Sequence, residues 1–138
     1  MTPHIQMPTT LRDALDQCNR IGITGGPNTG KTTLADEYAE HRDGAIVVHG
    51  DSLMHLEWSE ASKQLAKLGN TAEPPVIIEG VQVPRAIRKG LWLDVLVVRS
   101  TPFVELTKRQ RAMQKGIDTV IRDCRTEGLL IYTKVINA

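Results

Sequence analysis

The chain has 138 residues, which is the size of one domain with one hydrophobic core. Hydrophobic residues make up 41% and charged residues 24% of it, an ordinary globular composition that excludes disorder for most of the chain. Seventeen basic and sixteen acidic residues leave a net charge of +1, so no overall field attracts the protein to nucleic acid or to an anionic membrane. Any anion site must therefore be local.

Signals that would direct the chain to a membrane or out of the cell are not found in the sequence. No apolar run approaches the roughly 20 residues that span a bilayer. Residues 1–10 contain no apolar block of the kind found in secretory signals. Cys18 and Cys124 lie far apart and match no metal-ligand spacing, so packing is their expected role. We expect a protein of the reducing cytoplasm.

Short apolar runs alternate with helix-favouring segments along the chain. Residues 1–8 are expected to form a loose leader, and Thr10 is expected to cap a short helix with Leu11, Ala14, Leu15 and Cys18 on one face. Strands are expected at residues 21–24, 45–49, 76–79, 95–99 and 129–135. Further helices are expected at residues 31–40, 52–68, 84–89, 102–115 and 119–125, of which the one at 84–89 is short.

Two of these helices carry more specific expectations. In the helix at 52–68, Met54, Trp58, Ala61, Leu65 and Leu68 repeat at helical spacing and predict a packed seam. Trp58 is therefore expected in the core, with stacking on a nucleobase as the alternative. The helix at 102–115 is expected to begin through Thr101 as its N-cap and to end at Gly116.

The strand runs are rich in valine and isoleucine and show no polar alternation, so both of their faces should be buried. That pattern is typical of a parallel sheet covered by helices on both sides. We predict a three-layer α/β fold with about five strands. Residues 1–20 would form a leader and a short helix, and residues 21–138 would form the α/β domain.

The strongest motif is Gly-Gly-Pro-Asn-Thr-Gly-Lys-Thr at residues 25–32, which fits the phosphate-binding pattern G-x-x-x-x-G-K-[ST] at every fixed position. Glycines allow backbone N–H groups to point inward at an anion, and the following helix adds its positive dipole end. Lys31 would reach the β- and γ-phosphates, and the Thr32 hydroxyl would coordinate Mg²⁺. The expected nucleotide contacts are Gly25, Gly26, Pro27, Asn28, Thr29, Gly30, Lys31, Thr32 and Thr33. A guanine-specifying N-K-x-D sequence is absent, so ATP is the expected nucleotide.

Two carboxylates follow neighbouring strand runs, and ligands in such sheets lie beyond the carboxyl ends of the strands. Asp51 is placed to accept a proton from an attacking hydroxyl or to hold a metal-bound water. Its alternative role is to cap the helix predicted at 52–68. Glu79 ends an apolar strand, where a Mg²⁺-site acid would lie. Aspartate is commoner there, so we expect Glu79 to contact Mg²⁺ through water rather than to coordinate it directly.

Basic side chains follow the third and fourth strand runs. Arg85 and Arg88 share one helix face and are candidates to clamp an acceptor phosphate, because guanidinium matches phosphate geometry. A basic stripe is formed by Lys108, Arg111 and Lys115, with Arg109 beside it. Arg109 and Arg111 are candidates for a lid that neutralises transition-state charge. The alternative for both groups is a solvated basic surface. His49 and His55 show no metal-ligand spacing.

The stretches GGPNTGKTT, HGDS and VIIEG, followed in order by the basic helix, make the chain resemble the P-loop kinase group. The stretches WSEAS, IEGVQVPRAIRK and QRAMQKG resemble small, functionally unassigned ATPase or kinase-like proteins of bacteriophages and prophages. The resemblance implies the sheet order 2-3-1-4-5 and binding of ATP with Mg²⁺, and it supplies no acceptor. The chain is short for this group, so the pocket is expected to be open or completed by another subunit.

Two functions follow from these residues. The first is a kinase that transfers the γ-phosphate of ATP to a nucleoside, a nucleotide, a nucleic-acid end or another small acceptor. Lys31, Asp51 and Glu79 would be its catalytic residues, and Thr32, Asp51 and Glu79 would lie at the metal. The second is an ATP-dependent switch with slow hydrolysis that acts through a protein partner. Asp51 discriminates between them, because a switch has less need of a carboxylate there.

Overall fold

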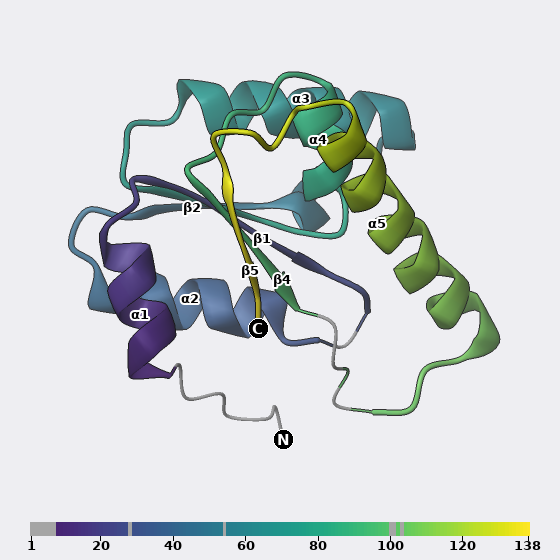
Figure 1. Cartoon of the computed structure of the whole chain (residues 1–138), viewed down its shortest axis with the longest axis horizontal. Helices are drawn as coiled ribbons and strands as arrows, with labels where there is room; N and C mark the ends of the chain where they lie inside the picture. The colour runs from purple at the N-terminus through teal and green to yellow at the C-terminus, as the bar shows by residue number, and fades with distance from the viewer. Residues whose placement is uncertain (1–7, 28, 54, 100–101, 103) are drawn as a thin grey trace.

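The computed structural model describes residues 8–27, 29–53, 55–99, 102 and 104–138. Its core is one sheet of five parallel strands in the order β2-β3-β1-β4-β5 (Figure 1). The strands are β1 (Arg20–Gly25), β2 (Ile46–His49), β3 (Val76–Glu79), β4 (Val95–Arg99) and β5 (Lys134–Asn137). The α/β class, the parallel sheet and the predicted strand order are therefore confirmed.

Helices cover both faces of this sheet (Figure 1). One face packs against α1 (Thr9–Asp16) and α2 (Lys31–His41), and the other against α3 (Trp58–Thr71), α4 (Val83–Arg88) and α5 (Lys108–Thr126). Consecutive strand residues alternate between the two cores, because side chains of a strand point to opposite faces. In β3, Ile77 belongs to the α1–α2 core, whereas Val76 and Ile78 belong to the other.

The prediction that a helix begins at residue 52 is wrong. A 3-10 turn, η1 (Gly50–Leu53), follows β2, and α3 begins only at Trp58. The Ser52 hydroxyl donates a 2.7 Å hydrogen bond to the His49 carbonyl and closes this turn, a local bond that competes with helix formation. Asp51 therefore lies in the turn and is not the cap of α3.

The predicted seam of α3 is only partly correct. Ala61 and Leu65 are buried, but Trp58 and Leu68 are exposed, and Met54 lies outside the described residues. The buried face instead includes the small residues Ser62, Ala66 and Gly69. A Cβ at Gly69 would lie 2.7 Å from Leu91 Cδ1, so the small residues allow α3 to approach its neighbours closely. Because these small residues form the buried face of α3, Trp58 lies at the surface.

The predicted break at Gly116 is also wrong, because α5 runs without interruption from Lys108 to Thr126. One glycine inside a helix costs only about 1 kcal/mol relative to alanine. Burial of the apolar face that includes Ile117 and Val120 offsets that cost. The helix begins six residues later than expected, with Thr107 and Gln110 forming a reciprocal capping box. The predicted cap, Thr101, lies outside the described residues.

The remaining differences lie at the ends of elements. The last strand is β5 at Lys134–Asn137, because residues 129–132 form a turn in which Tyr132 is 88% exposed. Helix α1 begins at Thr9 after Pro8, so Thr10 is not its cap. Cys124 is buried, Cys18 is half-buried, and neither forms a disulfide. Within the described residues, no helix combines the length and the apolar character that a membrane crossing requires.

Gly116→Ala is expected to stabilise the protein by about 0.5–1 kcal/mol, because alanine favours an uninterrupted helix. A Cβ there meets no atom within 4 Å. Gly44→Ala is the matched control, since its Cβ also meets nothing within 4 Å but its φ is +76°. Alanine in that left-handed conformation should destabilise by roughly 1–2 kcal/mol. Denaturant unfolding followed by circular dichroism measures both; loss of stability in Gly116→Ala would argue against a continuous α5.

Candidate functional site

The segment at residues 25–32, which we call the glycine loop, connects β1 to α2 as the motif predicts. Gly25 has a φ of 155°, and a Cβ there would lie 2.1 Å from the Arg99 carbonyl oxygen at the end of β4. Arg99 Nε donates a 3.2 Å hydrogen bond to the Thr29 carbonyl oxygen. Gly30 adopts the left-handed conformation, with φ of 77°, directly before α2. Both glycines are therefore required by the backbone path.

Side chains inside the glycine loop fix its shape from within. The Thr29 hydroxyl is buried and donates a 2.9 Å hydrogen bond to the Gly26 carbonyl oxygen. Lys31 Nζ donates to the same oxygen at 3.2 Å. Burial lowers the pKa of the Lys31 ammonium, and the nearby charges of Glu79 and Asp51 oppose that shift. The lysine is thus held in the loop close to two carboxylates. Asn28, another predicted contact, lies outside the described residues.

Glu79 ends β3 and is only 1% exposed. Its Oε2 accepts a 3.3 Å hydrogen bond from the Thr32 hydroxyl, at the first turn of α2. Its Oε1 lies 2.8 Å from Nδ1 of His49, and His49 Nε2 lies 3.4 Å from Asp36 Oδ1. The predicted pair Thr32 and Glu79 is therefore in contact.

The sequence analysis missed His49, although a signal for it exists. Histidine is a weak signal alone, and its spacing matches no metal motif. In the parallel register of β2 and β3, however, His49 is the direct partner of Glu79. Two polar residues that end neighbouring parallel strands in the same register must lie side by side. The sheet order together with the strand ends would have found the pair.

Asp51 lies in η1, directly after β2, and its side chain is exposed. Its charge, like that of Glu79, opposes the lowering of the pKa of the Lys31 ammonium. The turn that holds Asp51 begins with the buried Gly50. A Cβ on Gly50 would lie 3.0 Å from the Glu79 carbonyl oxygen, so glycine allows the ends of β2 and β3 to approach each other.

The oxygen atoms of Thr32 and Glu79 suit a hard cation such as Mg²⁺. No group of three or more His, Cys, Asp or Glu side chains placed to hold a metal is found within the described part of the chain. Mg²⁺ commonly binds through one or two protein oxygens plus substrate phosphates and water rather than in an all-protein cage. The hydroxyl and the carboxylate fit that kind of partial site.

The predicted acceptor residues lie on α4. Arg85 and Arg88 both line a cavity of about 480 Å³, together with Trp58, Ser59, Ser62 and Lys89. The Arg85 guanidinium carbon lies 5.0 Å from the centre of the Trp58 ring, a cation–π distance. Arg88 Nη2 lies 3.4 Å from Glu127 Oε1, and both of these side chains are exposed. The lining contains three cations and no carboxylate.

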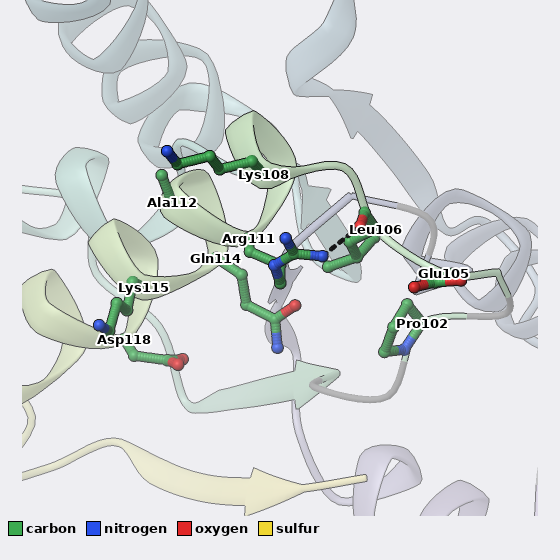
Figure 2. A pocket seen from close by; sticks show the side chains of 9 residues that line it. All are labelled: Pro102, Glu105, Leu106, Lys108, Arg111, Ala112, Gln114, Lys115 and Asp118. Carbon is green, nitrogen blue, oxygen red and sulfur yellow. Dashed lines mark hydrogen bonds between the residues drawn. The ribbon is translucent and has the colours of Figure 1, made fainter.

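The two predicted lid arginines line different cavities. Arg109 joins Arg85 and Trp58 around a cavity of about 390 Å³ between α3, α4 and α5. Arg111 lines a cavity of about 750 Å³ beside the first turns of α5, where it donates a 2.7 Å hydrogen bond to the Leu106 carbonyl oxygen (Figure 2). Gln114 points into the same cavity (Figure 2). A Cβ on Gly26 would lie 2.9 Å from Gln114 Cγ, so this cavity adjoins the glycine loop.

Models of known protein families and curated proteins were compared with the chain, and none of them matches it. The interpretation of the site therefore rests on its own residues and geometry.

Proposed function

We propose that the protein is a small ATP-dependent phosphotransferase that binds ATP with Mg²⁺ at the glycine loop. The observation that carries the proposal is the meeting of Lys31, Thr32 and Glu79 at one end of a loop with the full phosphate-binding pattern. The backbone N–H groups at the start of α2 and the ammonium of Lys31 supply positive charge for the phosphates. The rest of the nucleotide would occupy the cavity lined by Arg111 and Gln114, which adjoins the glycine loop.

We assign the other roles in phosphoryl transfer, which are holding the cation, orienting the phosphoryl group and accepting the proton, to residues of this chain. Thr32 and Glu79 would hold the cation, which when bound supplies charge neutralisation on the phosphates. Lys31 orients the migrating phosphoryl group. Asp51 is exposed on the same side and accepts the proton of the attacking hydroxyl.

The proposed acceptor carries a phosphate or another anionic group and binds beside Trp58. The cavity at Arg85 and Arg88 is lined by cations, hydroxyls and one indole. Arginine binds phosphate through paired hydrogen bonds, whereas an exposed indole offers a flat apolar surface. Because the chain's net charge is only +1, this local excess of cations favours an anionic ligand over a neutral one.

Lys31→Ala is expected to weaken binding of a non-hydrolysable ATP analogue with Mg²⁺ by about 10- to 100-fold, because a charged hydrogen-bond partner of the phosphates is lost. Lys67→Ala, at an exposed lysine of α3, is the matched control and should bind as the wild type does. Isothermal titration calorimetry measures both. Equal affinity in the wild type and Lys31→Ala would refute the assignment of the glycine loop.

Asp51→Asn should reduce phosphoryl transfer by about 10²–10⁴-fold, the usual range for loss of a general base. ATP affinity and the melting temperature should change little, since Asp51 is exposed. Transfer is measured from γ-labelled ATP to the best acceptor in a panel, and Asp43→Asn serves as the control for loss of one exposed carboxylate. Transfer within a few-fold of the wild type would exclude Asp51 as the base and would favour the switch.

Arg85→Ala is expected to raise KM for an anionic acceptor by about 10-fold or more while leaving ATP affinity unchanged, because it removes a charged contact from the proposed acceptor cavity. Arg122→Ala removes a comparable charge from a 74% exposed position on α5 and should leave both parameters unchanged. Steady-state kinetics with varied acceptor and varied ATP separate the two effects. A loss confined to ATP binding would place Arg85 on the nucleotide side.

A further inference from the structure

His49 connects the buried carboxylate of Glu79 to the surface carboxylate of Asp36. We propose that His49 is a positioning residue that fixes the Glu79 carboxylate for the divalent cation. The proposal rests on the proposed function, because it assumes that Glu79 and Thr32 serve a cation bound with the nucleotide. His49 itself would touch neither the cation nor the substrate.

Glu79 needs a strong donor because it is almost fully buried. A buried carboxylate loses its hydration and must recover it through hydrogen bonds. Its two oxygens have different partners: His49 Nδ1 lies 2.8 Å from Oε1, and the Thr32 hydroxyl donates to Oε2 over 3.3 Å. The shorter contact belongs to His49. The oxygen beside Thr32 therefore has the weaker contact and is the one available for exchange with a cation.

The geometry of the imidazole favours positioning over metal coordination. A carboxylate only accepts hydrogen bonds, so Nδ1 must carry the hydrogen in its contact with Glu79. The other ring nitrogen, Nε2, faces Asp36 Oδ1 at 3.4 Å. Both nitrogens are thus directed at carboxylates from two other elements, α2 and β3. This arrangement fixes the ring plane and engages both ring nitrogens with carboxylates.

The test uses two amide variants that differ in the nitrogen they mimic. Asparagine carries its amide nitrogen on Cγ, as His49 carries Nδ1, so His49→Asn retains the donor to Glu79. Glutamine places its amide nitrogen near the position of Nε2, so His49→Gln loses that donor. His49→Ala removes both ring nitrogens. The control is His55→Asn, at an exposed histidine between η1 and α3.

Binding of an ATP analogue is measured by calorimetry across a series of Mg²⁺ concentrations and in excess chelator. His49→Gln and His49→Ala should raise the Mg²⁺ concentration for half-maximal binding by about 10- to 100-fold, the usual effect of losing a residue that orients a metal ligand. His49→Asn should stay within about 3-fold of the wild type on the same scale. Metal-free affinity should be unchanged in all variants, which shows that the glycine loop is still folded.

Unchanged Mg²⁺ dependence in both His49→Gln and His49→Ala would overturn the proposal. So would an equal loss in His49→Asn and His49→Ala, because donation to Glu79 would then not be the cause. Failure of the proposed function has a different signature: the wild type itself would bind the nucleotide analogue neither with Mg²⁺ nor without it. The positioning role would then fall together with the proposed function, but not through any difference among the variants.

Discussion

The buried carboxylate of Glu79 is the constraint on which the arrangement of the site depends. It lies at the end of β3, between the strand that leads into the glycine loop and the strand that leads into η1. A charge in that position is tolerated only with hydrogen-bond donors on both oxygens. The donors come from α2 and from the end of β2, through Thr32 and His49. The hydrogen bonds of one buried group therefore join β3 to α2 and to β2.

The strand order makes this convergence geometrically simple. With β3 between β2 and β1, the three carboxyl ends lie next to one another, and the glycine loop follows directly from the last of them. Two further bonds hold the ends together: Thr24 donates to the Gly80 carbonyl oxygen at 2.9 Å, and the Gly80 N–H donates to Ile23. Gly50 and Gly80 pass so closely that a Cβ on Gly80 would lie 3.2 Å from Gly50 Cα. Side chains there would separate the strand ends.

What could be predicted from sequence follows the strength of local signals. The central strands are buried on both faces, and the glycine loop requires particular residues, so both leave clear patterns. The start of α3 is set by a local competitor, the hydrogen bond from Ser52 to the His49 carbonyl oxygen. The exposure of Trp58 and the continuity of α5 through Gly116 are decided by packing between elements. In these two cases a plausible local rule gave way to tertiary contacts. The His49–Glu79 pair is only partly predictable, because it follows from the sequence only after strand order and register are combined.

The charges at the site link binding of the cation to binding of the nucleotide. Near the glycine loop, Lys31 and Arg99 contribute positive charge, while Glu79 and Asp51 contribute negative charge. Uncompensated carboxylates weaken the attraction of such a site for a polyphosphate. On the proposed function, cation and nucleotide therefore each strengthen the binding of the other. The hydrogen bond from His49 to Glu79 addresses the same problem from inside the protein, because it satisfies the carboxylate without adding a group that competes for phosphate. On the proposed function, a chain with a net charge of +1 thus builds its anion site from a few well-placed residues.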